Sequence, residues 1–162
     1  MYNLLTRDGF TIKFAADGET VEAHNGEIAL ALVPGARAYA FGWGSEAVAF
    51  EGSIAHAYKG SNAVAYGKGA IAQAYYDSEA FASGKGSIAY AYGDGSIAHA
   101  YDGSIAYAYG TDSIAYAYGT DSIARAYGKD AIAQAYDGST AYAYSGARAY
   151  KYQNGAWVQI NV

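Results

Sequence analysis

The segment GSIAYAYGTDSIAYAYGTDSIARAYG, residues 103–128, contains one short unit three times. Each copy is a serine, an isoleucine, an alanine, a variable residue, an alanine and a tyrosine, followed by a turn-forming sequence. Variants of this unit recur about fifteen times between residues 25 and 152, and successive copies start eight or nine residues apart. A short fixed period indicates a solenoid, in which each unit packs on its neighbours and has no core of its own.

Each unit is expected to form one strand and one turn. Small and large side chains alternate along the unit, and Gly, Asp and Ser bound it, which is the pattern of a β-strand. A helix does not fit, because the glycine-rich break in every unit prevents several consecutive turns. The fold class is therefore predicted as all-β, a parallel β-solenoid with small non-repeating end caps.

The two faces of the predicted strand differ in what they tolerate. The serine and the two alanines share one face and hardly vary, whereas the isoleucine, the variable residue and the tyrosine share the other. Because unpaired charges and amides are costly in a closed interior, we predict that the small face points inward and the varied face outward. The reverse facing is the alternative. The polar side chains at outward positions include Arg37, Glu46, His56, Asn62, Gln73, Glu79, His99, Arg125 and Gln134.

The first outward position alternates between polar residues and isoleucine in the middle of the chain. In chain order these positions are Glu46, Ile54, Asn62, Ile71, Glu79 and Ile88. This alternation predicts that successive strands lie in two opposite sheets, giving a two-sheet β-roll with about 17 residues per coil. From Ile88 to Ile132 successive units all carry isoleucine at this position. A coil of three strands therefore remains an alternative for that part of the chain.

The two ends do not repeat and are predicted to cap the coil. Residues 1–24 are expected to form an N-terminal β-hairpin, with strands at 10–14 and 20–22 joined by an Asp-Gly turn at 17–18. Residues 25–152 are expected to form the solenoid, and residues 153–162 a C-terminal capping strand that carries Trp157 over the open core. Such caps protect the terminal strands from pairing with other chains.

Composition excludes several classes of partner. The formal net charge of −5 over 162 residues argues against nucleic acid, which requires clustered lysine and arginine. Without cysteine there is no disulfide framework or thiolate metal site. No stretch approaches the ~20 apolar residues of a membrane span, and the first residues lack the pattern of a signal peptide. We expect a virion-surface or extracellular location, reached by lysis or by another export route.

Candidate metal and catalytic arrangements are weak. The turns at 110–112, 119–121 and 128–130 each carry one aspartate, without the paired Gly-x-Asp pattern of calcium-binding nonapeptide repeats. Aspartates of this kind favour the turn itself. His56 and His99 occupy equivalent outward positions five units apart, too distant to share a metal. Neither a Ser/His/Asp set nor a carboxylate pair stands out. We therefore expect no enzyme activity, metal or cofactor.

The repeats SIAxAYG, together with SNAVAYG (61–67) and SEAFASG (78–84), resemble the head repeats of trimeric autotransporter adhesins and related repeats of phage fibre and spike proteins. The resemblance implies a left-handed parallel β-roll and a homotrimer. The unit here is eight or nine residues long, against seven in those heads. The neck, stalk and membrane-anchor segments of the adhesins are not seen, and this difference favours a virion component.

The outward aromatic side chains are the candidate binding residues. Stacked rings stabilise adjacent strands, and tyrosine also suits contact with a protein or a glycan. We expect a structural or adhesive rod, such as a phage fibre, spike or decoration module, that contacts a host glycan or protein. We also expect a homotrimer, because the isoleucine columns need cover. The candidate residues are Tyr90, Tyr92, His99, Tyr107, Tyr109, Tyr116, Tyr118, Arg125, Gln134, Tyr142 and Tyr144.

Two alternatives have a different physical basis. An ice-binding β-solenoid would use the same flat, regular faces, but such faces usually carry rows of threonine. Threonine occurs in these repeats only at Thr111, Thr120 and Thr140. A self-assembling amyloid-like fibre is disfavoured by the regular turns and the predicted caps.

Overall fold

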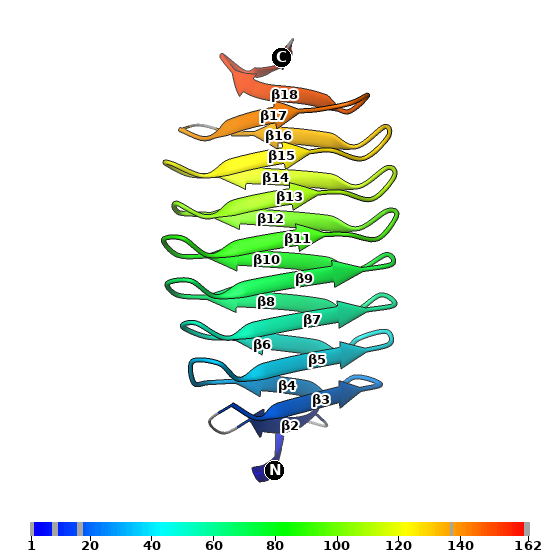
Figure 1. Cartoon of the computed structure of the whole chain (residues 1–162), viewed down its shortest axis with the longest axis vertical. Coiled ribbons are helices and arrows are strands. Elements are labelled where there is room, and N and C mark those ends of the chain that lie inside the picture. The colour runs from blue at the N-terminus through cyan, green and yellow to red at the C-terminus, as the bar shows by residue number, and fades with distance from the viewer. Residues whose placement is uncertain (1, 8–9, 16–17, 137, 161–162) are drawn as a thin grey trace.

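The computed structural model is a rod built from two facing β-sheets, with the two termini at opposite ends (Figure 1). It describes residues 2–7, 10–15, 18–136 and 138–160, and among these there is no helix. Successive strands alternate between the sheets, and the turns line the two long edges of the rod (Figure 1). We call the sheets even and odd after the numbering of their strands.

The even sheet also contains the first and last strands of the chain. In spatial order it comprises β1 (Tyr2–Arg7), β2 (Phe10–Ala15), β4 (Ile28–Ala31), β6 (Glu46–Ala49), β8 (Asn62–Tyr66), β10 (Glu79–Ser83), β12 (Ile97–Tyr101), β14 (Ile114–Tyr118), β16 (Ile132–Ala135), β18 (Arg148–Gln153) and β19 (Ala156–Ile160). The odd sheet comprises β3 (Thr20–His24), β5 (Arg37–Phe41), β7 (Ile54–Tyr58), β9 (Ile71–Tyr75), β11 (Ile88–Ala91), β13 (Ile105–Ala108), β15 (Ile123–Ala126) and β17 (Thr140–Ala143).

From β2 to β18 each strand pairs in parallel with the strand two places along the chain. The register repeats the sequence unit: Ile88 pairs with Ile71 on one side and Ile105 on the other, at an interval of 17 residues. The predicted two-sheet β-roll is thus confirmed. Two strands form each coil beyond Ile88 as well, so the three-strand coil is wrong for that part.

The core consists almost entirely of alanine side chains. Both inward alanines of β14, Ala115 and Ala117, are completely buried, and the same holds for the inward alanines of β4 to β16. The largest fully buried apolar side chain is Val21. The predicted facing, with serine and alanine inside, is confirmed. The two sheets lie so close that a methyl group fills the space between them.

Most of the buried serines close the turn that precedes them, and the exception is Ser96, whose Oγ has no hydrogen-bond partner among the described residues. In the unit that begins at Ser61, its Oγ lies 2.9 Å from the carbonyl oxygen of Tyr58 and 3.0 Å from that of Ala40 on the coil below. The same Oγ accepts a hydrogen bond of 2.7 Å from the Tyr58 amide. Ser104 and Ser139 make the same pair of carbonyl contacts. A buried hydroxyl is satisfied in this way while it joins neighbouring coils.

The residue before each inward serine, or before the residue that replaces it, has a positive φ angle. Eleven of these fifteen residues are glycine, and the remaining four are Asp77, Asp112, Asp121 and Asp130. Only glycine, asparagine and aspartate adopt this left-handed conformation at low cost. The turn aspartates are therefore favoured because they tolerate a positive φ angle, in addition to the local hydrogen bonding expected from sequence.

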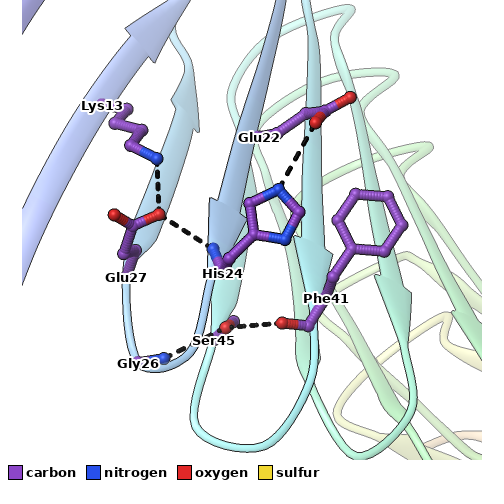
Figure 2. A network of polar contacts seen from close by, with 7 residues as sticks. All are labelled: Lys13, Glu22, His24, Gly26, Glu27, Phe41 and Ser45. Carbon is purple, nitrogen blue, oxygen red and sulfur yellow. Dashed lines mark hydrogen bonds and ion pairs between the residues drawn. The ribbon is translucent and has the colours of Figure 1, made fainter.

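In the first repeat, Glu27 replaces the serine and closes the turn with its carboxylate (Figure 2). Oε2 of Glu27 accepts a hydrogen bond of 2.9 Å from the amide of His24 and one of 2.5 Å from Nζ of Lys13. The lysine contact, followed by the amide contact, lowers the pKa of Glu27. In the next coil Ser45 restores the usual arrangement, donating to the Phe41 carbonyl and accepting from the Gly26 amide (Figure 2).

The N-terminal hairpin lies elsewhere than the pattern predicts. The predicted strands at 10–14 and 20–22 belong to opposite sheets, as β2 and β3, and each pairs in parallel with the coil above it. The reason is the inward facing of Val21 and Ala23, which makes β3 part of the coil. The antiparallel hairpin is formed by β1 and β2. Asp17 of the predicted turn lies outside the described residues.

At the C-terminus, β19 folds back antiparallel on β18 through Asn154 and Gly155, whose φ angles are 51° and 82°. This two-residue hairpin pairs Trp157 with the outward Tyr152, and Ile160 with the inward Ala149. Ile160 therefore packs against the end of the core, and Trp157 does not cover it as predicted. The register of the Asn-Gly turn decides which side chain points inward.

We expect Ala115→Leu to destabilise the protein by about 2–3 kcal/mol or more, because a larger side chain must separate the two sheets. Tyr116→Leu, at the adjacent outward position, should cost about 1 kcal/mol through the lost ring stack. Urea denaturation followed by circular dichroism measures both. Equal destabilisation by the two variants would contradict the inward facing of Ala115.

Candidate functional site

One long edge of the odd sheet carries an unbroken column of stacked rings. Neighbouring ring centroids are 4.5–5.5 Å apart, and their planes differ by 3–22°. Because the strands are parallel and in register, equivalent side chains repeat at the ~4.8 Å spacing of the strands. We call this set the odd corner column: His24, Phe41, Tyr58, Tyr75, Tyr92, Tyr109, Tyr127 and Tyr144.

The odd corner column is partly open to solvent. Tyr92, Tyr109 and Tyr144 each retain 39–40% of their exposed area. Burial, followed by the neighbouring phenols, raises the pKa of Tyr92 to about 12. The Tyr92 phenol therefore stays neutral at ordinary pH, and it can donate and accept hydrogen bonds at the rim of a continuous apolar surface.

A second column runs along the middle of the odd sheet and includes Arg125. The Arg125 guanidinium lies over the rings of Tyr107 and Tyr142, 5.5 and 5.7 Å from their centroids. Its Nη1 donates a hydrogen bond of 3.0 Å to the Tyr107 hydroxyl. Arg125 thus occupies a ring position within the column, and the geometry is that of a cation–π contact on both sides.

The even sheet has equivalent columns that are less regular. In its middle column, the His99 imidazole is stacked between Phe81 and Tyr116, with centroid distances of 4.6 and 5.0 Å. Its corner column, which we call the even corner column, is interrupted by a serine at β10. The members of the even corner column are Leu32, Phe50, Tyr66, Ser83, Tyr101, Tyr118, Tyr136 and Tyr152.

The isoleucines form a third outward column on each sheet. Ile88, Ile105 and Ile123 stack on the odd sheet, and Ile97, Ile114 and Ile132 stack on the even sheet. All of them are half-buried, because the residues above and below cover part of each side chain. The most exposed apolar side chains instead lie at the corners and turns, with Trp43 at 79% and Tyr76 at 66%.

The candidate residues chosen from sequence lie on two opposite faces. The odd sheet carries Tyr90, Tyr92, Tyr107, Tyr109, Arg125, Tyr142 and Tyr144, and the even sheet carries His99, Tyr116, Tyr118 and Gln134. The expected columns are present, but a single partner cannot touch both sets at once. Since the units alternate between sheets, odd and even units could have been separated by counting along the sequence.

Two histidines are enclosed by the aromatic columns. Burial lowers the pKa of His99 to about 4, and it has the same effect on the pKa of His56, where Arg37 adds to it. In both rings Nδ1 is buried without a hydrogen-bond partner among the described residues. These side chains act as neutral aromatic members of their columns, not as exposed polar contacts.

The described part of the chain holds no group of three or more His, Cys, Asp or Glu side chains placed to hold a metal. Within the same residues, no helix is long and apolar enough to cross a membrane. No protein-family model, curated protein or solved structure matches the chain. Any functional argument therefore rests on the outer faces of the two sheets, which present stacked aromatic rings, phenol hydroxyls and two half-buried histidines.

We expect the stability of the protein to fall as the pH drops from 6.5 towards 4, because the unfolded chain binds protons at its histidines before the folded chain does. His99→Phe should reduce this dependence while keeping the column intact, since Phe81 already occupies the equivalent position one strand away. Denaturation midpoints at neutral pH and near pH 4 provide the measurement. Gln134→Phe, which adds a ring to the same column without removing a titratable group, is the control. An unchanged pH dependence in His99→Phe would show that His99 is not the responsible group.

Proposed function

We propose that the chain is a non-enzymatic structural or adhesive rod, of the type that phage fibres, spikes and trimeric autotransporter heads represent. The observation that carries the proposal is the odd corner column, in which eight rings stack without a break along the whole odd sheet. A surface of this kind suits a lasting contact with another macromolecule, since aromatic side chains supply large contact area at low entropic cost.

Rigidity supports the same proposal. From β2 to β18 every strand is hydrogen-bonded to the next coil, and the inward side chains are almost all alanine or serine. Alanine has no side-chain rotamers. Buried serines such as Ser61, Ser104 and Ser139 tie their turns to the coil below. Such a scaffold holds its outward side chains at fixed spacing.

We propose that copies of the chain associate through the odd corner column and form a trimer. This column is a straight ridge at an edge of the rod, ~34 Å long for seven strand intervals. A contiguous apolar ridge with tyrosines about two-fifths exposed is more than a monomer usually presents to water. Three copies can bring the same ridge to a common threefold axis, which leaves their even faces outward.

We expect light scattering to give a mass of three times the 16.9 kDa of the chain at micromolar concentration. Replacing Tyr92 and Tyr109 together by serine should lower this mass, because two adjacent rings of the ridge are lost. The matched control is the replacement of Tyr118 and Tyr136 by serine, which removes two stacked rings from the even face. A monomer mass for the wild-type chain would overturn the proposed association.

In a binding assay, the adhesive role predicts that the larger effect comes from the other double variant, at Tyr118 and Tyr136. With the odd faces packed together, the pair at Tyr118 and Tyr136 remains outward, and its loss should weaken binding to host cells or to glycans on an array by about tenfold or more. Thermal hysteresis is measured on the same samples. Ice shaping without any glycan or cell binding would replace the adhesive role by the ice-binding alternative.

A further inference from the structure

From Phe50 to Tyr152 the even corner column lacks a ring only at Ser83, and a hollow opens at that position. Ser83 of β10 pairs in register with Tyr66 of β8 on one side and Tyr101 of β12 on the other. These three residues line a hollow of about 370 Å³, together with Val64 of β8 and Phe81 of β10. That volume lies within the range of pockets that hold small ligands.

The spacing of the two tyrosines defines what fits between them. Tyr66 and Tyr101 are two strands apart, which places their backbones ~9.6 Å from each other. Stacked rings elsewhere in the corner columns have centroids 4.5–5.5 Å apart, so a guest ring midway would stack on both tyrosines at the usual distance. Tyr66 is 47% exposed, consistent with a ring that has lost one stacking neighbour.

The other end of the hollow carries a carboxylate without a counter-charge. Glu46 and Asn62 line this end, in adjacent strands of the even sheet. No hydrogen bond or ion pair joins the half-buried Glu46 side chain to any other described residue, whereas Glu27 has both. Burial raises the pKa of Glu46. A carboxylate stripped of water in this way gains most from a cationic partner.

Charges around the hollow give it a direction. Glu79 lies next to Asn62 in the sheet and adds a second carboxylate near the Glu46 end. The turns beyond the other end carry charges of both signs, Lys68 and Lys85 together with Glu51 and Asp102. Only the Glu46 end therefore has an excess of negative charge that attracts a cation.

We propose that this hollow binds a long-chain arylalkylamine, with its ring between Tyr66 and Tyr101 and its ammonium group directed towards Glu46. Ser83 and Glu46 are two strands and four residues apart, or ~16 Å between their Cα atoms, so the alkyl chain must span most of the hollow. The ring replaces the missing member of the even corner column, and Phe81 and Val64 provide apolar contact for the chain. The amide oxygen of Asn62 is a second acceptor for the ammonium protons. The hollow lies on the same even face as Tyr118, which stacks on Tyr101. Its test uses a small ligand and substitutions at Glu46 and Ser83, so either proposal can fail without the other.

Isothermal titration with three probes separates the contributions of ring and charge. 6-Phenylhexylamine carries both at a separation that spans the hollow, 6-phenylhexanol carries the ring alone, and hexylamine carries the charge alone. We expect 6-phenylhexylamine to bind the wild-type chain at least tenfold more tightly than either of the others. Equal affinity of 6-phenylhexylamine and 6-phenylhexanol would overturn the role of the carboxylate, and absence of 6-phenylhexylamine binding at millimolar concentration would overturn the site.

Two substitutions locate the site within the hollow. Glu46→Gln should remove the preference for 6-phenylhexylamine over 6-phenylhexanol, whereas Glu22→Gln, exposed on the odd sheet and with the same loss of charge, should leave it unchanged. Ser83→Tyr should complete the even corner column, reduce 6-phenylhexylamine binding at least tenfold, and maintain or raise the thermal midpoint. Wild-type affinity in a folded Ser83→Tyr protein would place the ligand elsewhere and overturn the proposal. If that variant does not fold, the Glu46→Gln comparison still decides.

Discussion

The space between the two sheets admits a methyl group and little else, and the rest of the structure depends on this limit. Ala115, Ala117 and their equivalents from β4 to β16 are completely buried. Among the described residues the buried polar side chains are serines, most of which close turns. A core of this kind contributes little burial per residue. Stability must therefore come also from what repeats along the rod: the parallel hydrogen-bond ladders, the serine contacts and the outward stacks.

In-register stacking turns a sequence repeat into columns of like side chains. The backbone sets the spacing at ~4.8 Å, so any flat side chain at an outward position meets its neighbours face to face. This explains why Arg125 and His99 take ring positions in their columns, although they are polar. It also explains the lowered pKa of His99, because the stack that accommodates the neutral ring removes the water that its charged form needs.

The repeat was enough to predict the solenoid, the two-sheet coil and the inward face, because period and alternation are direct consequences of strand geometry. The ends could not be predicted from the repeat. At the C-terminus the Asn154-Gly155 dipeptide is a recognisable hairpin signal, and counting residues outward from it would have placed Ile160, not Trp157, against the core. The hollow could not be predicted from the sequence, because Ser83 shows its effect only when the strand register places it between Tyr66 and Tyr101.

Departures from the repeat are not scattered evenly. On the even sheet the first outward position is polar in β6, β8 and β10, and the same three strands contain the gap at Ser83. The odd strands at the same height, β7, β9 and β11, keep isoleucine. A missing ring costs about 0.5–1.5 kcal/mol of stacking and leaves the alanine core unchanged, so the fold gains nothing from it. What these residues change is the surface of one face over a short length of the rod. These departures from the repeat therefore change which molecules the even face can contact.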